Sequence, residues 1–168
     1  IEKSKRLEQQ SSALVQISTH ESLLKGNFQE ALRFVTEKVS EVINIDRAGI
    51  WLYEMNDSVL ICKDIFVASS NEHSSGYALE LKDYPKYFNS LHNQLAIDAN
   101  DARTDIRTSE FLDSYLIPVG ITSMLDVAIR ESGRTIGVLC LEHTGKKRIW
   151  TEDEISFVLH TAEQFSVL

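Results

Sequence analysis

The spacing of the apolar residues changes along the chain, and this change restricts the fold more than any other sequence feature. Residues 28–43 and 155–165 place apolar side chains on one face at helical spacing. Between these segments, residues 48–53 and 59–67 are apolar runs separated by a polar stretch of hairpin length. Hairpins enclosed by terminal helices predict an α+β fold with an antiparallel sheet.

A second hairpin is the clearest local prediction. Residues 121–130 and 135–143 flank a short polar segment in which Gly133 permits a tight reversal. The strand runs carry apolar residues at both odd and even positions, so we expect the sheet to be covered on both faces. Terminal helices would cover one face and residues 68–120 the other, with a small-molecule cavity beneath this middle segment.

The middle segment is expected to alternate loops with short elements. A helix should begin at Pro85, which suits a first helical turn. A second short helix should begin near Ser109 and stop at Pro118 and Gly120. The other expected pieces are a loop over residues 68–76, a short strand over 95–97 and a polar loop over 98–107.

The two ends of the chain are predicted to be helical. Asn27 with Glu30 and Thr151 with Glu154 each have the spacing of a capping box, which marks a helix start. Residues 1–24 have weak heptad spacing and are predicted to form a connecting helix, a candidate coiled-coil linker. The globular domain is therefore expected over residues 25–168.

Composition excludes some functions and favours one compartment. The formal net charge of −8 argues against a nucleic-acid partner. No apolar run approaches the ~20 residues that span a bilayer, so no direct membrane contact is expected. The only cysteines, Cys62 and Cys140, lie in apolar strand runs and are predicted to be buried free thiols. A soluble, cytoplasmic domain is the expectation.

Several stretches, in this order, resemble the GAF domain family of bacterial sensor proteins. They span residues 46–53, 73–76, 83–88, 101–108, 115–126, 137–143 and 148–154. The resemblance implies a six-stranded antiparallel sheet with a helical layer behind and a ligand cavity under loops and short helices in front. It also implies dimerisation through the terminal helices and an output domain in the same parent chain, such as a histidine kinase of a two-component system or a nucleotide cyclase.

The ligand site is expected around this front cavity, and the ligand itself is unidentified. Buried tyrosine hydroxyls and interrupting polar residues need partners that a ligand can supply. Acidic and basic groups of the polar loop would close the cavity mouth and orient a polar ligand, although pairing within the loop is the favoured alternative. The candidate residues are Tyr84, Phe88, Asp101, Arg107, Tyr115, Ser123 and Met124.

Other chemistries are less well supported. Covalent bilin attachment needs a cysteine on or near the front helix, and residues 109–121 contain none. Residues 100–103 do not match the cyclic-nucleotide motif of the family. Glu142 and His143 should face opposite sides of a strand and cannot share a metal, and His73 is expected to fix its loop by hydrogen bonds.

The domain is therefore expected to be a sensory module and not an enzyme. A ligand-free dimerisation connector remains open, as does, with less support, a cysteine-dependent redox enzyme with Cys140 as nucleophile. A PAS domain is the structural alternative. The helix before the first strand and the capped closing helix favour a GAF domain.

Overall fold

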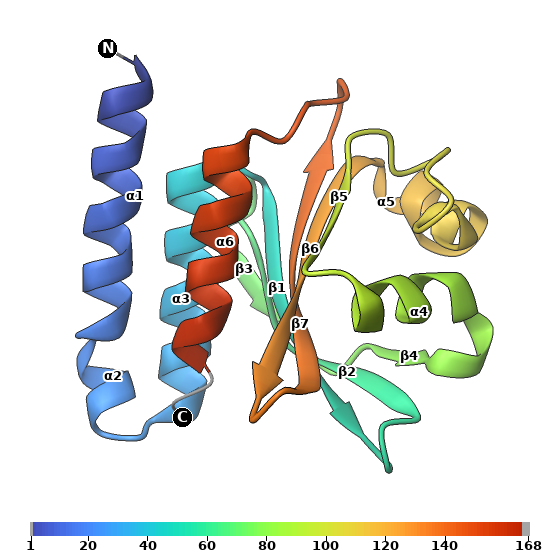
Figure 1. The fold of residues 1–168 in the computed structure, drawn as a ribbon, viewed down its shortest axis with the longest axis horizontal. Coiled ribbons are helices and arrows are strands. Elements are labelled where there is room, and N and C mark those ends of the chain that lie inside the picture. Colours follow the sequence, from blue (N-terminus) through green and yellow to red (C-terminus); the bar gives the residue numbers. More distant parts are fainter. Residues whose placement is uncertain (1, 166–168) are drawn as a thin grey trace.

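A central sheet separates two layers of helices and loops in the computed structural model, which describes residues 2–165. Helices α1 (Glu2–Ser18), α3 (Phe28–Ile43) and α6 (Glu152–Phe165) cover one face, which we call the back (Figure 1). Helix α4 (Pro85–Asn93) and the segment that follows β5 cover the front. The mixed α+β architecture expected from the sequence is confirmed.

The sheet has seven strands, and all its pairings are antiparallel. Six strands follow the order β3-β2-β1-β7-β6-β5, and β4 pairs with β2 beside β3. Their bounds are β1 (Arg47–Glu54), β2 (Val59–Val67), β3 (Glu72–Ser74), β4 (Ala78–Glu80), β5 (Ala96–Ala99), β6 (Ile121–Glu131) and β7 (Arg134–Thr144). β3 lies inside the expected loop over residues 68–76, so that part of the prediction is wrong. Its three residues are too few to show a strand period.

The β6–β7 hairpin is confirmed and turns in two residues. Ser132 and Gly133 have φ values of 51° and 78°. Two consecutive residues with positive φ are typical of the type I′ turn, whose twist matches that of the paired strands.

Local capping signals fix the ends of the back helices. The Asn27 side chain accepts a hydrogen bond from the Glu30 amide, and the left-handed Asn44 ends α3. At the start of α6, the Thr151 amide donates to Glu154 Oε1 at 2.9 Å. Glu154 N in turn donates to Thr151 Oγ1 at 3.3 Å, which completes a capping box. At α3 only the cap bond of Asn27 forms, because the Asn27 amide donates to the Ser22 carbonyl instead of to Glu30.

The N-terminal helix belongs to the back layer. Ala13 and Ile17 are buried in the same core as residues of α3 and α6. Arg6 and Gln10 both donate to the Asp153 carboxylate of α6, with distances of 2.8–2.9 Å. The single helix expected over residues 1–24 is interrupted, because α1 ends at Ser18 and a short α2 (Glu21–Leu24) follows. The outer limits of the two expected segments, at residues 1 and 168, lie outside the described residues.

Within residues 2–165, no helix is both long enough and apolar enough to cross a membrane.

Candidate ligand site

A buried cavity of about 30 Å³ lies between the front face of the sheet and the front layer. A cavity of this size holds about one water molecule, whereas pockets for small-molecule ligands measure roughly 300–1,000 Å³. A larger molecule therefore enters only if the front layer moves. The lining residues are Trp51, Leu60, Leu79, Tyr87, Phe111, Tyr115, Met124, Asp126, Cys140 and Glu142.

Strand alternation and register bring the polar lining groups together. Asp126 of β6 lies opposite Cys140 of β7, and Gly49 of β1 lies on the other side of Cys140. Gly49 has no side chain, and the indole of Trp51 lies over it. A Cβ atom at Gly49 would be 3.3 Å from Trp51 Nε1. Met124 is opposite Glu142 in the next row of the same face.

Glu142 is buried in an ion pair that joins the sheet to the front layer. Its carboxylate accepts hydrogen bonds from Arg47 Nε at 2.9 Å and from the Tyr115 hydroxyl at 2.7 and 2.8 Å. Burial, with the charge of Glu142, raises the pKa of Tyr115 above its ordinary value. The register places Arg47 directly opposite Glu142. Of these three residues only Tyr115 was a predicted site residue, although the carboxylate of Glu142 in an apolar strand run was a visible signal.

Asp126 is buried without a cationic partner. Its Oδ2 accepts a hydrogen bond from the Tyr87 hydroxyl, and Cys140 lies opposite it on β7. Burial raises the pKa of Asp126 to about 7, against the lowering effect of the Tyr87 hydrogen bond. Among the described residues, Asp126 Oδ1 and Trp51 Nε1 have no hydrogen-bond partner.

An aromatic cluster forms the front wall. Phe111 stacks on Tyr84 with ring centroids 4.3 Å apart and meets Tyr87 edge-on at 4.9 Å. The ring of Tyr115 lies 6.4 Å from that of Phe111. The cluster combines residues of α4 with residues of the segment after Thr108.

The segment from Ser109 to Gly120 is helical throughout but changes its helix type. A 3₁₀ turn (Ser109–Phe111) leads into a π-helical stretch (Leu112–Leu116) and then a single α turn (Ile117–Val119). The expected helix over residues 109–116 exists, but Pro118 does not stop it, because Pro118 lies within that α turn. Gly120 ends the segment with φ of 88°. Irregular hydrogen bonding of this kind often marks a functional segment.

Four of the predicted site residues lie in or beside the front core. Tyr115 and Met124 line the cavity. Phe88 is buried next to it, in edge-on contact with Tyr87. Tyr84 stacks on Phe111, and its hydroxyl lies 3.3 Å from Ser114 Oγ, away from the cavity lining.

The other three predicted residues lie elsewhere. Arg107 pairs with Asp105 at 2.9 Å and with Asp98 at 3.0 Å. Asp101 pairs with Lys147 at 3.1 Å. Arg107 therefore pairs within the polar loop, as the alternative interpretation expected, whereas Asp101 pairs with a residue outside it.

Ser123 points to the back face, the opposite side from Met124. Its hydroxyl donates to the Asn100 carbonyl at 2.8 Å and accepts from the Arg148 amide at 3.0 Å. A polar residue in an apolar strand does need partners, but here the backbone supplies them.

Both thiols are buried and free, as predicted. Burial, with a contribution from Asp64, raises the pKa of Cys62 to about 12 and burial raises that of Cys140 well above its ordinary value. A thiol with a raised pKa is a poor nucleophile at neutral pH. His73 bonds through Nδ1 to Asp64 at 2.9 Å and through Nε2 to Glu37 at 2.6 Å, which confirms its expected structural role. Between residues 2 and 165, no cluster of three or more His, Cys, Asp or Glu side chains has the geometry to hold a metal ion.

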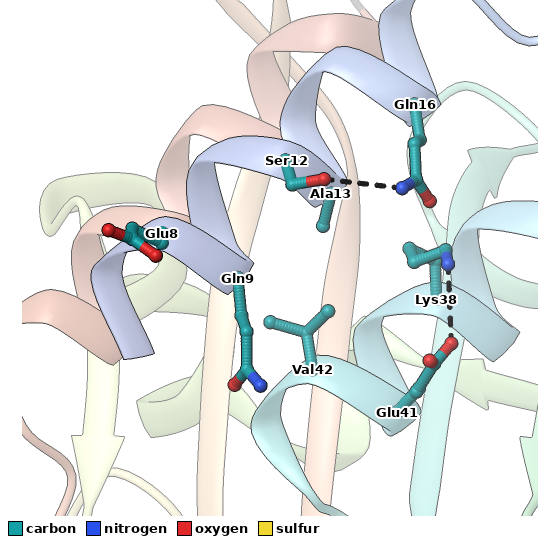
Figure 2. Close-up of a pocket in the computed structure, with 8 residues that line it drawn as sticks. All are labelled: Glu8, Gln9, Ser12, Ala13, Gln16, Lys38, Glu41 and Val42. Atoms are coloured by element: carbon teal, nitrogen blue, oxygen red, sulfur yellow. Dashed lines mark hydrogen bonds and ion pairs between the residues drawn. The ribbon is translucent and has the colours of Figure 1, made fainter. Parts of the chain in front are cut away.

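A wider groove of about 360 Å³ runs along the back layer between α1 and α3 (Figure 2). Its polar side chains bond to each other, with Gln16 Nε2 3.3 Å from Ser12 Oγ and Lys38 Nζ 3.3 Å from Glu41 Oε2. The groove has no buried polar group that lacks a partner. The front cavity is therefore a better candidate ligand site than this groove.

Comparisons with known proteins identify the fold. The family model for the GAF domain matches residues 27–168. No curated protein matches the chain.

Solved structures with the same fold come from several kinds of protein. The phycoerythrobilin-bound GAF domain of a cyanobacterial phytochrome has a TM-score of 0.77 at 18% identity, covering 94% of this chain and 92% of that one. The GAF domain of an Acinetobacter phosphoenolpyruvate-protein phosphotransferase has a TM-score of 0.74 at 15% identity, with 97% and 91% covered. Residues 122 to 287 of a methyl-accepting chemotaxis protein have a TM-score of 0.69 at 17% identity, with 92% and 93% covered. The chain therefore belongs to the GAF domain family.

Proposed function

We propose that this GAF domain is the sensory or regulatory domain of a bacterial signal-transduction protein. It binds a small molecule in the front cavity and relays the binding event through α1 and α6 to an output domain, such as a histidine kinase or cyclase, in the same parent chain. On this proposal the domain is not an enzyme, works in the cytoplasm and forms a homodimer through its terminal helices.

The observation that carries the proposal is the position of the cavity relative to the back layer. Asp126 of β6 lines the cavity, while its neighbours Leu125 and Val127 are buried in the back core with Phe157 of α6. A ligand that displaces the front face of β6 therefore acts on the surface against which α6 packs. Signal follows if the ligand has different affinities for two arrangements of the helices.

The similar structures support this proposal at the level of protein class. One has a bilin bound, and one belongs to a chemotaxis protein. A covalently attached bilin is not proposed here, because residues 109–121 contain no cysteine.

Native mass spectrometry of protein purified from bacterial cells tests the proposal, with the denatured mass as reference. Wild type is compared with Leu79→Phe, which adds a ring at the cavity, and with Leu95→Phe, which adds the same ring at a side chain that is 64% exposed. We expect a non-covalent mass excess in wild type and in Leu95→Phe. The fraction of protein that carries this excess should be at least fivefold lower in Leu79→Phe. Bare protein in all three samples, even after incubation with a metabolite extract, would contradict ligand binding.

A ligand-free dimeric connector is the second candidate, and the small volume of the cavity favours it. The same spectra distinguish the two functions, because a connector would be a dimer without a mass excess under every condition.

A further inference from the structure

Two buried polar atoms at the front cavity lack a partner among the described residues, and they differ in chemistry. Trp51 Nε1 is an N–H group that can only donate, whereas Asp126 Oδ1 belongs to a carboxyl group that, in its ionised form above about pH 7, can only accept. Trp51 is 5% exposed and Asp126 is 1% exposed. Leaving such a group unpaired costs about 1–3 kcal/mol, so each requires a reason.

The two atoms lie toward opposite ends of one row across the sheet. Trp51 Nε1 lies above Gly49, and Gly49, Cys140 and Asp126 are neighbours on β1, β7 and β6. The backbones at the two ends of this row are separated by two strand spacings, about 10 Å. A single molecule that reaches both atoms must lie along the row, over the Cys140 side chain.

The surrounding groups restrict the charge of such a molecule. None of the described residues that line the cavity is cationic, which disfavours an anion. A simple ammonium ion would pair with Asp126 but has no acceptor for Trp51. The remaining walls include the side chains of Leu60, Phe111 and Met124, which favour a flat apolar body.

We infer that the front cavity selects a neutral, planar ring compound that carries an N–H donor at one end, for Asp126, and a carbonyl-type acceptor at the other, for Trp51. This inference rests on the proposed function, because it specifies the ligand of the same site.

The front layer supplies the movement that such a ring requires. The cavity measures about 30 Å³, so a ring must displace part of the front wall. Phe111 and Tyr115 belong to the segment in which a 3₁₀ turn passes into a π-helical stretch. Hydrogen bonds in these helix types are weaker than in an α-helix, so we expect residues 109–116 to move more readily than the strands of the sheet.

The two tryptophans make the binding test specific to the cavity. The ¹H–¹⁵N spectrum reports the indole N–H of Trp51, which lines the cavity, and that of Trp150, which lies 3.4 Å from the Ala99 carbonyl and serves as an internal reference. The probe is 4(1H)-quinolone, whose N–H and carbonyl groups lie at opposite ends of one ring. The comparison compounds are N-methyl-4-quinolone, naphthalene and tryptamine.

We expect 4(1H)-quinolone to shift the Trp51 indole signal while the Trp150 signal stays in place. N-methylation of the probe should weaken its binding at least tenfold, because the methyl group removes the donor for Asp126. The variants test the two polar atoms separately. In Trp51→Phe, where binding is followed through the backbone amides of β6, the affinity for 4(1H)-quinolone should fall at least tenfold and the affinity for naphthalene less than threefold. Asp126→Leu should lower the two affinities by the same factors. Asp113→Asn, at an exposed acid, is the matched control and should change neither affinity. If either cavity variant does not fold, the comparison of methylated and unmethylated probe on wild type decides the question.

The failures of the inference and of the proposed function are distinguishable. If naphthalene or tryptamine shifts the Trp51 signal at equal or lower concentration than 4(1H)-quinolone, the donor–acceptor class is wrong but the cavity still binds small molecules. If no compound at millimolar concentration shifts the Trp51 signal, the inference about the ligand class is overturned. The sensory function is overturned separately, by bare protein in the native mass spectra of all three samples.

Discussion

Asp126 and Glu142 are buried carboxyl groups on neighbouring strands with different electrostatic surroundings. Glu142 is paired with the guanidinium of Arg47 and with the Tyr115 hydroxyl. The donor to Asp126 is the neutral hydroxyl of Tyr87. A buried carboxyl without a cation favours its protonated form, which explains why the pKa of Asp126 is raised to about 7.

This difference predicts a pH dependence of stability. The pKa of Asp126 is higher in the folded chain than in the unfolded chain, so the folded chain holds more protons between about pH 4 and pH 7. Its contribution to stability is therefore full below about pH 4 and is lost as the pH rises through 7. From pH 5 to pH 8, wild type should lose roughly 2–3 kcal/mol more than Asp126→Asn in free energy of unfolding by urea. Equal losses in wild type, Asp126→Asn and the control Asp113→Asn would show that Asp126 ionises normally.

The two cysteines should be unreactive in the folded protein. The pKa of Cys62 is raised to about 12, that of Cys140 is also raised, and both side chains are buried. With a thiol-specific chromogenic disulfide at pH 8, we expect labelling of the native protein to be at least a hundredfold slower than labelling in urea. Rapid labelling of the native protein that is lost in Cys140→Ser would instead support a redox enzyme with Cys140 as nucleophile.

Among the elements, α1 depends on α6 for its position. Asp153 accepts hydrogen bonds from Arg6 and Gln10, and these bonds hold the pKa of Asp153 well below its usual range. Arg6→Ala should speed amide exchange in residues 2–18 by roughly twofold to fivefold, the effect expected for a surface ion pair. Exchange in α3 should not change. Lys3→Ala is the control, and equal exchange in both variants would mean that burial of Ala13 and Ile17 alone holds the helix.

The sequence predicted those elements whose signals are local. Capping at Asn27 and Thr151 and the turn at Gly133 depend on neighbouring residues, and all three are confirmed. Strands β3 and β4 have three residues each and exist because β2 offers them an edge, which no local pattern reports.

The site was less predictable because its contacts join distant parts of the chain. The group of Arg47, Tyr115 and Glu142 combines β1, β7 and the segment between β5 and β6, and only the sheet register brings these residues together. The resemblance to GAF domains predicted a cavity on the front face of the sheet, and Tyr115 and Met124 line the cavity that lies there. Arg107 was a weaker candidate because its guanidinium already donates a hydrogen bond to the carboxylate of Asp105, two residues away.

At the scale of the whole molecule, the proposed function requires that a displacement of the front layer alters the position of the back helices through the sheet between them. Alternate side chains of β6 and β7 belong to the back core and to the front core. A displacement of either strand therefore changes the packing on both faces. Helix α6 packs on β6 and is joined to α1 through Asp153, so we expect both helices to respond to such a displacement.

Hydrogen–deuterium exchange measured by mass spectrometry tests this central claim most directly, because it reports both layers at once. Leu79→Phe places an added ring at the cavity, and Leu95→Phe places the same ring in solvent. The account predicts that exchange in residues 2–18 and 152–165 changes at least twofold in Leu79→Phe and does not change in Leu95→Phe. Changes in Leu79→Phe confined to residues 78–120, with both terminal helices unaffected, would contradict it.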